Sequence, residues 1–395
     1  MATVARRVGA ACVLGITAAV CGFGACDRGE TFGPPLQGTG AGNGSGGGGG
    51  SLLPPEDGGP PPLDAAGLCG NQLHQTIADA PNVYFVIDAS GSMSVPVGSK
   101  TRFEIVRSAA IDLVRDLGAL INVGAALFPD ASDDGGCGAG EQVMQVTPGD
   151  PYSGADGPTT KKFKSATNVS PNGGTPTAPT LESLRPGLKA LPGKTFVVLV
   201  TDGGPNCNAD LLCAASECMA NIEGCSGYTC CDPGGNCCEP GDAAGPEGCV
   251  DKQASILAVK DYAEAGIPVY VVGIAGSEAY ADVLEDMAIA AGTAQIAKPF
   301  YYAVDKLDNL GGVLGDIAAV AVSCVFNVED PPEEADQTNV YLDGVVLPGD
   351  LENGWRWMDP ELTRIELVGQ ACSDLKSGKV KVVQIVSGCP TEPPK

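Results

Sequence analysis

The chain has 395 residues, of which 44% are hydrophobic, and its 48 acidic residues outnumber 23 basic ones, which gives a formal net charge of −25. This length and apolar content support a sizeable folded core. Nucleic acid is not expected as a partner, because phosphate binding depends on basic patches. The single histidine, His74, argues against catalysis that needs a placed imidazole.

The N-terminus carries the signs of an export signal. Arg6 and Arg7 form a charged start, residues 8–25 carry no charge, and small residues precede Cys26. Residues 23–26 resemble the bacterial lipoprotein signal, in which the cysteine becomes the lipidated first residue of the mature chain. We therefore expect a signal peptide over 1–25 and an envelope protein, periplasmic or on the surface, that is held to a membrane by lipid on Cys26. An ordinary cleaved signal, which would leave a secreted protein, or an uncleaved anchor is the alternative.

Residues 26–66 are expected to be a linker that begins at the lipidated cysteine. Gly44 to Ser51 consists only of glycine and serine, and proline-rich sequence follows at 54–62. Such a composition cannot form a core, so we expect this segment to be a disordered tether.

The cysteines agree with export. Of 17, two leave with the signal and Cys26 would carry lipid, so 17 − 2 − 1 = 14 remain, an even number that suits disulfides in an oxidising compartment. Nine lie between Cys207 and Cys249, and an odd cluster needs an outside partner, for which Cys137 is the candidate. Zinc is the alternative for this cluster, although Cys-x-x-Cys spacing is lacking within it and export disfavours free thiolates.

Strand and helix patterns alternate through the middle of the chain. Short apolar runs predict buried strands at 83–87, 121–128, 195–201 and 268–273, and helical spacing predicts helices at 101–118, 173–191, 251–265, 278–290 and 305–322. This alternation predicts a doubly wound α/β fold with a mostly parallel sheet. The cysteine-rich residues 203–250 interrupt it as an insert.

The pattern changes to β after residue 325. Asp343-Gly344 interrupts an apolar run at 339–347, which indicates a hairpin, and 363–368 and 379–386 alternate as strands do. We therefore expect a small β domain over 325–395, with Cys372 and Cys389 joining its parts.

Polar side chains follow the first strand directly. Asp88, Ser90 and Ser92 come at its carboxyl end, where open α/β sheets present ligands, and Gly91 allows a sharp turn between the serines. One carboxylate with several neutral oxygens suits a hard divalent cation.

Three motifs that follow one another along the chain make the interpretation of Asp88 to Ser92 more specific. They are Asp88-Ala89-Ser90-Gly91-Ser92, Gly173-Gly174-Thr175 at a helix start and Thr201-Asp202-Gly203 at the end of a second strand. Residues 80–324 thereby resemble a von Willebrand factor type A domain with a metal-ion-dependent adhesion site, and we assign that domain to 67–324. The resemblance implies that Ser90, Ser92 and Thr175 supply hydroxyl oxygens, while Asp88 and Asp202 bind the ion directly or through water. Thr177 is a nearby competitor for Thr175.

The resemblance also implies a function. Mg²⁺ is the expected ion, with Mn²⁺ or Ca²⁺ as alternatives, and an Asp or Glu carboxylate of a protein partner would complete its coordination. The expected activity is adhesion rather than catalysis. The alternatives are a structural or assembly component of the cell envelope and a metal-assisted hydrolase, for which no general base is evident.

The insert and the ends of the fold give two further expectations. The insert leaves from the loop that carries Asp202, so we expect it on the metal face as a rim that selects the ligand; alternatively, its disulfides only replace a missing core. In this fold the two ends of the domain can be neighbours, and we expect Cys69 to pair with Cys324.

Overall fold

The computed structural model describes residues 72–391 except 75, 79, 131, 133–135, 152–155, 225–233, 305, 378 and 381. These residues belong to one compact unit, Leu53–Lys395. The expectations for the signal peptide, for lipid on Cys26, for the linker and for Cys69 lie outside the described residues. Within the part of the chain that is described, no helix is long and apolar enough to cross a membrane.

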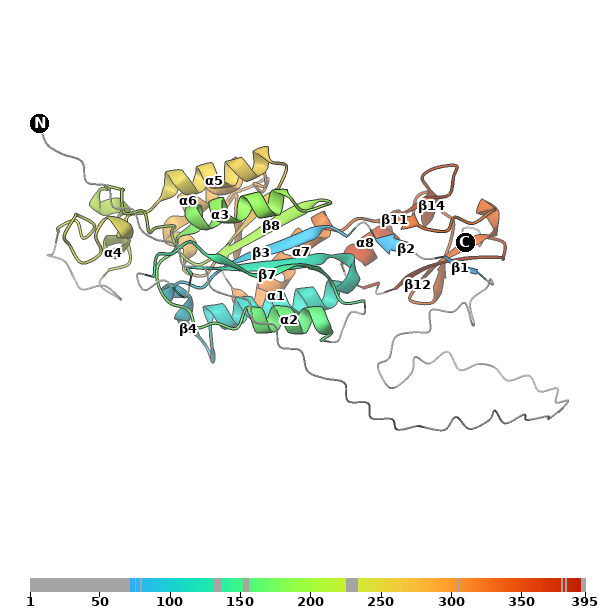
Figure 1. Cartoon of the computed structure of the whole chain (residues 1–395), viewed down its shortest axis with the longest axis horizontal. Coiled ribbons are helices and arrows are strands. Elements are labelled where there is room, and N and C mark those ends of the chain that lie inside the picture. Colours follow the sequence, from blue (N-terminus) through green and yellow to red (C-terminus); the bar gives the residue numbers. More distant parts are fainter. Residues whose placement is uncertain are drawn as a thin grey trace, which may run out of the picture. The chain divides into compact units, whose positions relative to one another are not determined.

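A six-stranded sheet forms the centre of the larger module (Figure 1). The strand order is β10-β9-β8-β3-β6-β7, and every neighbouring pair is parallel except β6 and β7. The expected doubly wound, mostly parallel sheet is therefore confirmed. The strands are β3 (Asn82–Asp88), β6 (Asn122–Phe128), β7 (Glu141–Pro148), β8 (Thr195–Thr201), β9 (Val269–Ile274) and β10 (Tyr302–Val304).

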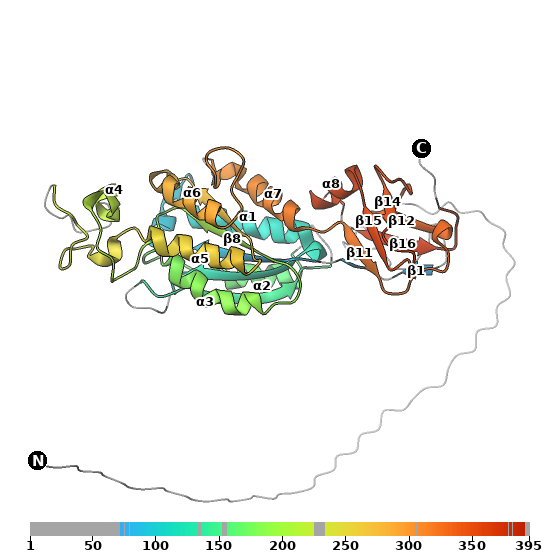
Figure 2. The same ribbon diagram turned by 90° about the horizontal axis from the view of Figure 1, so that it is seen from above.

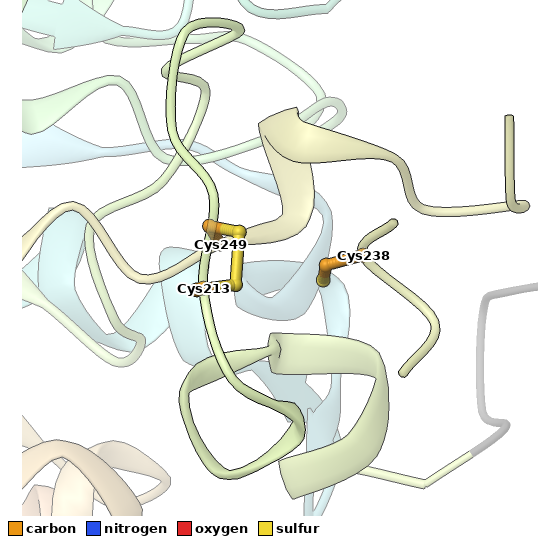
Figure 3. Close-up of side chains that lie close together, drawn as sticks. All are labelled: Cys213, Cys238 and Cys249. Atoms are coloured by element: carbon orange, nitrogen blue, oxygen red, sulfur yellow. A yellow bond between two sulfur atoms is a disulfide. The ribbon is translucent and has the colours of Figure 1, made fainter. Parts of the chain in front are cut away.

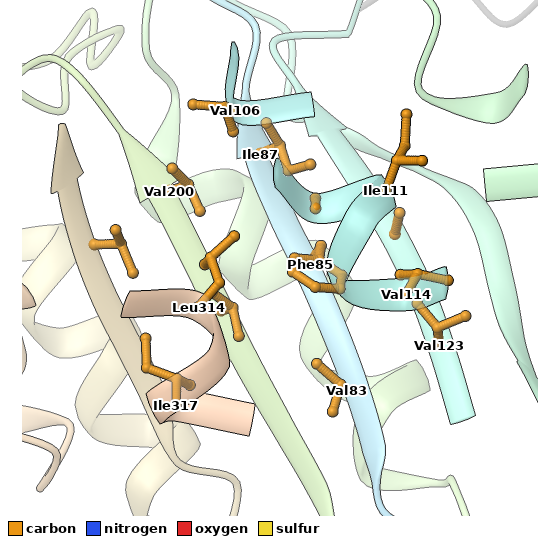
Figure 4. Close-up of a cluster of buried hydrophobic side chains, with 14 of the residues drawn as sticks. Val83, Phe85, Ile87, Val106, Ile111, Val114, Val123, Val200, Leu314 and Ile317 are labelled. Atoms are coloured by element: carbon orange, nitrogen blue, oxygen red, sulfur yellow. The ribbon is translucent and has the colours of Figure 1, made fainter. Parts of the chain in front are cut away.

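Helices cover both faces of this sheet because its central strands are apolar on both sides. On β3, Phe85 joins the cluster formed with α1, α2 and α7, whereas Tyr84 joins the cluster formed with α3, α5 and α6 (Figure 4 shows the first cluster). The helices are α1 (Arg102–Leu117), α2 (Pro158–Ala166), α3 (Thr177–Lys189), α5 (Lys252–Glu264), α6 (Ala281–Ala290) and α7 (Leu310–Ala321).

The start of α1 is fixed by a capping box. The Glu104 amide donates to the Thr101 hydroxyl at 3.2 Å, and the Thr101 amide donates to the Glu104 carboxylate at 2.8 Å. These two bonds satisfy amides that the first turn would leave without partners. They also fix the position of Arg102 as the first helical residue. A two-stranded ribbon of β4 (Pro96–Val97) and β5 (Lys100–Thr101) precedes the helix.

The second module consists of two four-stranded sheets (Figure 2). One has the order β1-β16-β12-β13, the other β14-β15-β11-β2. The expected hairpin joins β12 to β13, and Asp343 and Gly344 both have positive φ, 49° and 80°. The elements are β1 (Gln72–His74), β2 (Thr76–Ala78), β11 (Val325–Val328), β12 (Thr338–Leu342), β13 (Val345–Leu347), β14 (Trp355–Trp357), β15 (Arg364–Leu367), α8 (Gln370–Lys376) and β16 (Val383–Ser387).

The expected domain boundary at residue 67 is wrong in one respect. β1 pairs with β16 and β2 pairs with β11, so residues 72–74 and 76–78 belong to the β module and not to the α/β module. Three-residue strands are too short to show a period of two in the sequence, which is why the pairing was missed. The buried His74 has a structural role there, since its ring contacts the Asp330 carbonyl and lies 2.7 Å from the Ser387 hydroxyl.

The disulfides correct two expected pairings and confirm a third. Cys324 bonds to Cys372, which overturns both the Cys69–Cys324 and the Cys372–Cys389 pairing. Cys324 precedes β11 and Cys372 lies on α8, and both belong to the same apolar cluster, a proximity that depends on packing and not on sequence spacing. Cys389 is also disulfide-bonded. Cys137 bonds to Cys207, as expected for the odd cluster.

Candidate metal centre

Asp88 lies at the carboxyl end of β3 and is completely buried. Its Oδ1 accepts a hydrogen bond from the Ser90 amide at 2.8 Å, and its Oδ2 accepts one from the Thr201 hydroxyl at 2.5 Å. Burial, reinforced by the negative charge of Asp202, raises the pKa of Asp88 to about 7. The carboxylate is therefore held firmly in a place where its charge lacks full compensation.

The two serines occupy the turn that follows Asp88. Ser90 precedes a short 3-10 helix, Gly91–Ser94, and the hydroxyl oxygens of Ser90 and Ser92 are 3.0 Å apart. The Ser92 hydroxyl donates to Oδ1 of Asp202 at 2.7 Å. The ends of β3 and β8 are thus linked through side chains that the sequence placed 110 residues apart.

The loop that carries Thr175 packs directly on the serine turn. The Gly91 amide donates to the Gly173 carbonyl at 2.9 Å, and the Asn172 amide donates to the Ala89 carbonyl at 2.8 Å. Gly173 has φ +84°, and a β-carbon there would lie 2.4 Å from the Gly136 carbonyl, so this turn requires glycine.

Thr175 rather than Thr177 faces the serines. A β-carbon built on Gly203 would lie 3.7 Å from the Ser92 hydroxyl oxygen and 4.0 Å from that of Thr175, so both hydroxyls border the same small space. Thr175 lines the cavity described below, whereas the Thr177 hydroxyl bonds to the Thr175 carbonyl at 3.4 Å. No partner for the Thr175 hydroxyl occurs among the described residues.

Two residues support the site in roles that the sequence did not predict, although Thr201 belongs to one of the three motifs. The Thr201 hydroxyl donates to Asp88. Oδ1 of Asn206 accepts from the Thr175 backbone amide at 2.6 Å, and the Asn206 backbone amide donates to the Thr175 carbonyl at 3.0 Å. Thr201 directly precedes Asp202, so its position was a usable signal. Nothing local in the sequence indicates the role of Asn206.

Arg102 was also missed, and it forms an ion pair with the second carboxylate. Its Nη1 lies 2.5 Å from Oδ2 of Asp202, whose side chain is fully buried. Burial raises the pKa of Asp202, while hydrogen bonds from Ser92 and Arg102 act in the opposite direction. The two residues are 100 positions apart, so only the folded chain reveals the pair.

A cavity of about 790 Å³ opens above this cluster. Its wall includes Ser90, Ser92, Thr175 and Asp202, while Asp88 is buried next to them. The other part of the wall comes from the insert, and its members include Met219, Ile222, Glu223, Ala244 and Glu247. The insert therefore borders the same cavity as the predicted metal ligands.

A disulfide at the start of the insert packs against the Thr175 loop. A β-carbon on Gly174 would lie 2.5 Å from Sγ of Cys207 and 3.3 Å from Sγ of Cys137, so the Cys137–Cys207 disulfide packs directly on this loop. At the insert's other edge, the Tyr280 hydroxyl donates to Glu223 at 2.6 Å. The insert also contains α4 (Met219–Ile222).

The zinc alternative does not fit the insert cysteines. The sulfurs of Cys213, Cys238 and Cys249 lie within 4.8 Å of one another (Figure 3). However, Cys213 bonds to Cys249 and Cys218 bonds to Cys238. A zinc ligand must be a thiolate, which a disulfide sulfur is not.

The donor set of the Asp88 cluster fits a hard divalent cation. It offers only oxygen: two carboxylates and the hydroxyls of Ser90, Ser92 and Thr175. Of the two buried acids, Asp202 pairs with Arg102, whereas burial and the charge of Asp202 raise the pKa of Asp88, so a further positive charge would stabilise the ionised form of Asp88. Mg²⁺ and Mn²⁺ prefer such oxygen ligands.

Comparison with known proteins identifies the domain. The family model described as "VWA: von Willebrand factor type A domain" matches residues 82–316. The chain is similar to the pilus adhesin SpaC from Lactobacillus rhamnosus GG, with 15% identity and a TM-score of 0.45 over 80% of this chain and 40% of that one. It thus spans less than half the length of that adhesin.

Two other solved structures show a similar likeness. The vWF domain of the type V pili tip protein Mfa5 from Porphyromonas gingivalis has 14% identity and a TM-score of 0.41, over 62% of this chain and 95% of that one. Manganese-loaded TRAP protein from Plasmodium vivax has 14% identity and a TM-score of 0.36, over 61% and 74%. A search of curated proteins found no match. Likenesses this distant carry no information about the ligand of this chain.

Proposed function

Because the chain belongs to the von Willebrand factor type A domain family, we propose that it is an exported binding protein that engages an acidic group of a protein partner through a divalent cation. The observation that carries this proposal is the meeting of five oxygen-bearing side chains from three loops beside one cavity. Two buried carboxylates with neutral hydroxyls leave a bound cation short of negative charge, which favours an incoming carboxylate.

Each residue has a distinct task in this proposal. Ser90, Ser92 and Thr175 would hold the ion through neutral oxygens, and Asp88 and Asp202 would offset its charge directly or through water. Mg²⁺ is the preferred ion, and it would supply the positive charge that a partner's Asp or Glu recognises. Thr201 and Asn206 keep the carboxylate and the Thr175 loop in place.

The insert is proposed as the rim that selects the partner. Its wall of Met219, Ile222, Glu223 and Glu247 faces the cavity, and the Cys137–Cys207 disulfide ties it to the Thr175 loop. A pre-ordered rim loses less conformational entropy when the partner binds. Lipid attachment at Cys26 remains part of the proposal and rests on the sequence of residues 1–26 alone.

Calorimetry with Mg²⁺ and with Mn²⁺ tests the metal site. Asp88→Asn should remove measurable binding, because it deletes one of two carboxylates that balance the ion. Asp150→Asn is a matched control, since Asp150 is equally buried but bonds to the start of α2. Equal binding by wild type and Asp88→Asn would show that the site assignment is wrong.

Partner capture from an extract of cell-surface material tests the use of that site. Capture should require Mg²⁺ and be lost with a chelator, whereas a purely structural envelope component would retain its partner in both conditions. Replacing 207–249 by a short linker, together with Cys137→Ser, should abolish capture even at a Mg²⁺ concentration that saturates the metal site of the variant. Unchanged capture by that variant would contradict the selecting role of the insert.

A further inference from the structure

We propose that Arg102 is a built-in counter-cation of Asp202 that weakens binding of the metal alone and thereby couples metal binding to the partner's carboxylate. The inference rests on the proposed function above. Its starting point is the 2.5 Å contact between Nη1 of Arg102 and Oδ2 of Asp202, one of the two carboxylates of the cluster.

The surrounding backbone is shaped for the guanidinium. A β-carbon at Gly276 would lie 2.7 Å from Nη1 and 2.8 Å from both Cζ and Nη2 of Arg102, closer than real contacts allow. Gly276 also has φ +114°, a conformation that other residues rarely adopt. The turn before the 3-10 helix Ser277–Tyr280 therefore leaves room for Arg102 in this position.

The position of Arg102 on its helix points to a role beyond helix formation. Arg102 is the first residue of α1, where the positive end of the helix dipole disfavours a cation. Its Nε is buried and has no partner among the described residues. The ion pair with Asp202 is thus the contact that holds the charged group against these two unfavourable effects.

The charge balance gives the functional consequence. With both carboxylates ionised, Asp88, Asp202 and Arg102 sum to −1, so a divalent cation raises the total to +1 and one partner carboxylate returns it to zero. Without Arg102 the total would already be zero before the partner arrives. Arg102 therefore disfavours the metal alone and favours the metal together with a carboxylate, a reciprocal coupling between two ligands.

Arg102→Gln tests this coupling, with acetate as the carboxylate probe. Calorimetry should show Mg²⁺ or Mn²⁺ binding roughly tenfold tighter to the variant than to wild type in chloride buffer, because a charge that repels the ion is gone. Acetate should tighten metal binding to wild type but leave Arg102→Gln nearly unchanged. Lys100→Gln is the matched control, since it removes the same charge from an exposed side chain two residues earlier.

The outcomes separate the inference from the function beneath it. Equal or weaker metal binding by Arg102→Gln, with Arg102→Lys behaving as wild type, would overturn the counter-cation role and leave the metal site standing. Metal binding by neither protein would overturn both proposals. Binding by Arg102→Gln but not by wild type would support the counter-cation role and contradict cation use by the native chain.

Discussion

Replacing Thr201 by valine tests how strongly the buried Asp88 depends on its neighbour. The substitution keeps the shape of the side chain but removes the hydroxyl that donates to Oδ2 of Asp88 at 2.5 Å. Both residues are buried, Thr201 at 2% exposure, so water cannot replace the lost donor easily. The Ser90 amide would remain as the donor to Oδ1.

The expected loss follows from the charge of the acceptor. A hydrogen bond to an ionised group contributes about 1.5–3 kcal/mol to the free energy of unfolding. For a module of this size, a loss of ~2 kcal/mol lowers the melting temperature by roughly 4–8 °C. The effect should be largest at pH 8.5, because Asp88 is ionised above its pKa of about 7.

Thermal unfolding at pH 8.5 in chelator, with disulfides intact, measures this loss. Thr195→Val is the matched control, because it makes the same change in the same strand where the hydroxyl only accepts from Asn82 at 3.1 Å. Asn82 keeps a second bond there, to the Pro192 carbonyl at 2.8 Å, so the control should lose about 1 kcal/mol or less. Equal losses in the two variants would refute the claim that the Asp88 charge makes the difference.

Two further predictions concern Asp150, a buried carboxylate outside the site, and the disulfide that joins the insert to the Thr175 loop. Burial acts to raise the pKa of Asp150, but hydrogen bonds from Thr160 and Thr159 outweigh burial, so the pKa is lowered. Asp150→Asn should therefore lower the free energy of unfolding by about 1–3 kcal/mol at pH 7. A carboxyl group whose pKa is lowered by folding stabilises the fold at pH values above its pKa in the unfolded chain. This stabilisation is lost as the pH falls through its pKa in the folded chain, so the urea midpoints of variant and wild type should converge below about pH 4. A gap between the midpoints that stays constant with pH would contradict this. Cys137→Ser with Cys207→Ser opens a loop of 70 residues and should cost ~4 kcal/mol in thermal unfolding. Metal affinity should also fall, whereas Cys213→Ser with Cys249→Ser should reduce stability but leave metal affinity unchanged; equal effects on metal affinity would be the contrary result.

The α/β fold was predictable because its central strands are continuous apolar runs that only burial on both faces explains. β3 and β9 are buried throughout, and their boundaries in the sequence lie within one residue of the structure. β7 was missed because it is an edge strand with mixed exposure, and the nine-residue α2 was missed because it carries mostly polar residues. Both elements depend on tertiary contacts more than on local pattern.

The candidate site likewise contains residues that a local sequence pattern predicts and residues that only the folded chain brings together. Asp88, Ser90 and Ser92 lie in one short stretch, and their clustering could be expected from the turn alone. Arg102 and Asn206 act on residues far along the chain, and neither the first residue of a helix nor a loop asparagine indicates such a partner. The Cys324–Cys372 pair was likewise hidden, because cysteine counts give no connectivity.

The β module combines strands that precede the α/β module in the sequence with strands that follow it, and this affects how the chain completes its fold. His74 on β1 contacts Ser387 on β16, which lies 313 positions later in the sequence. Similarly, β2 precedes the α/β module in the sequence and pairs with β11, which follows it. During synthesis from the N-terminus, β1 and β2 emerge before the strands with which they pair, and β16 follows only when nearly the entire chain has been made. The α/β module can assemble in the meantime from its own contacts. A protein cut short before β11 would therefore present a finished α/β module with two unpaired strands at its beginning, an exposed edge that invites aggregation or proteolysis.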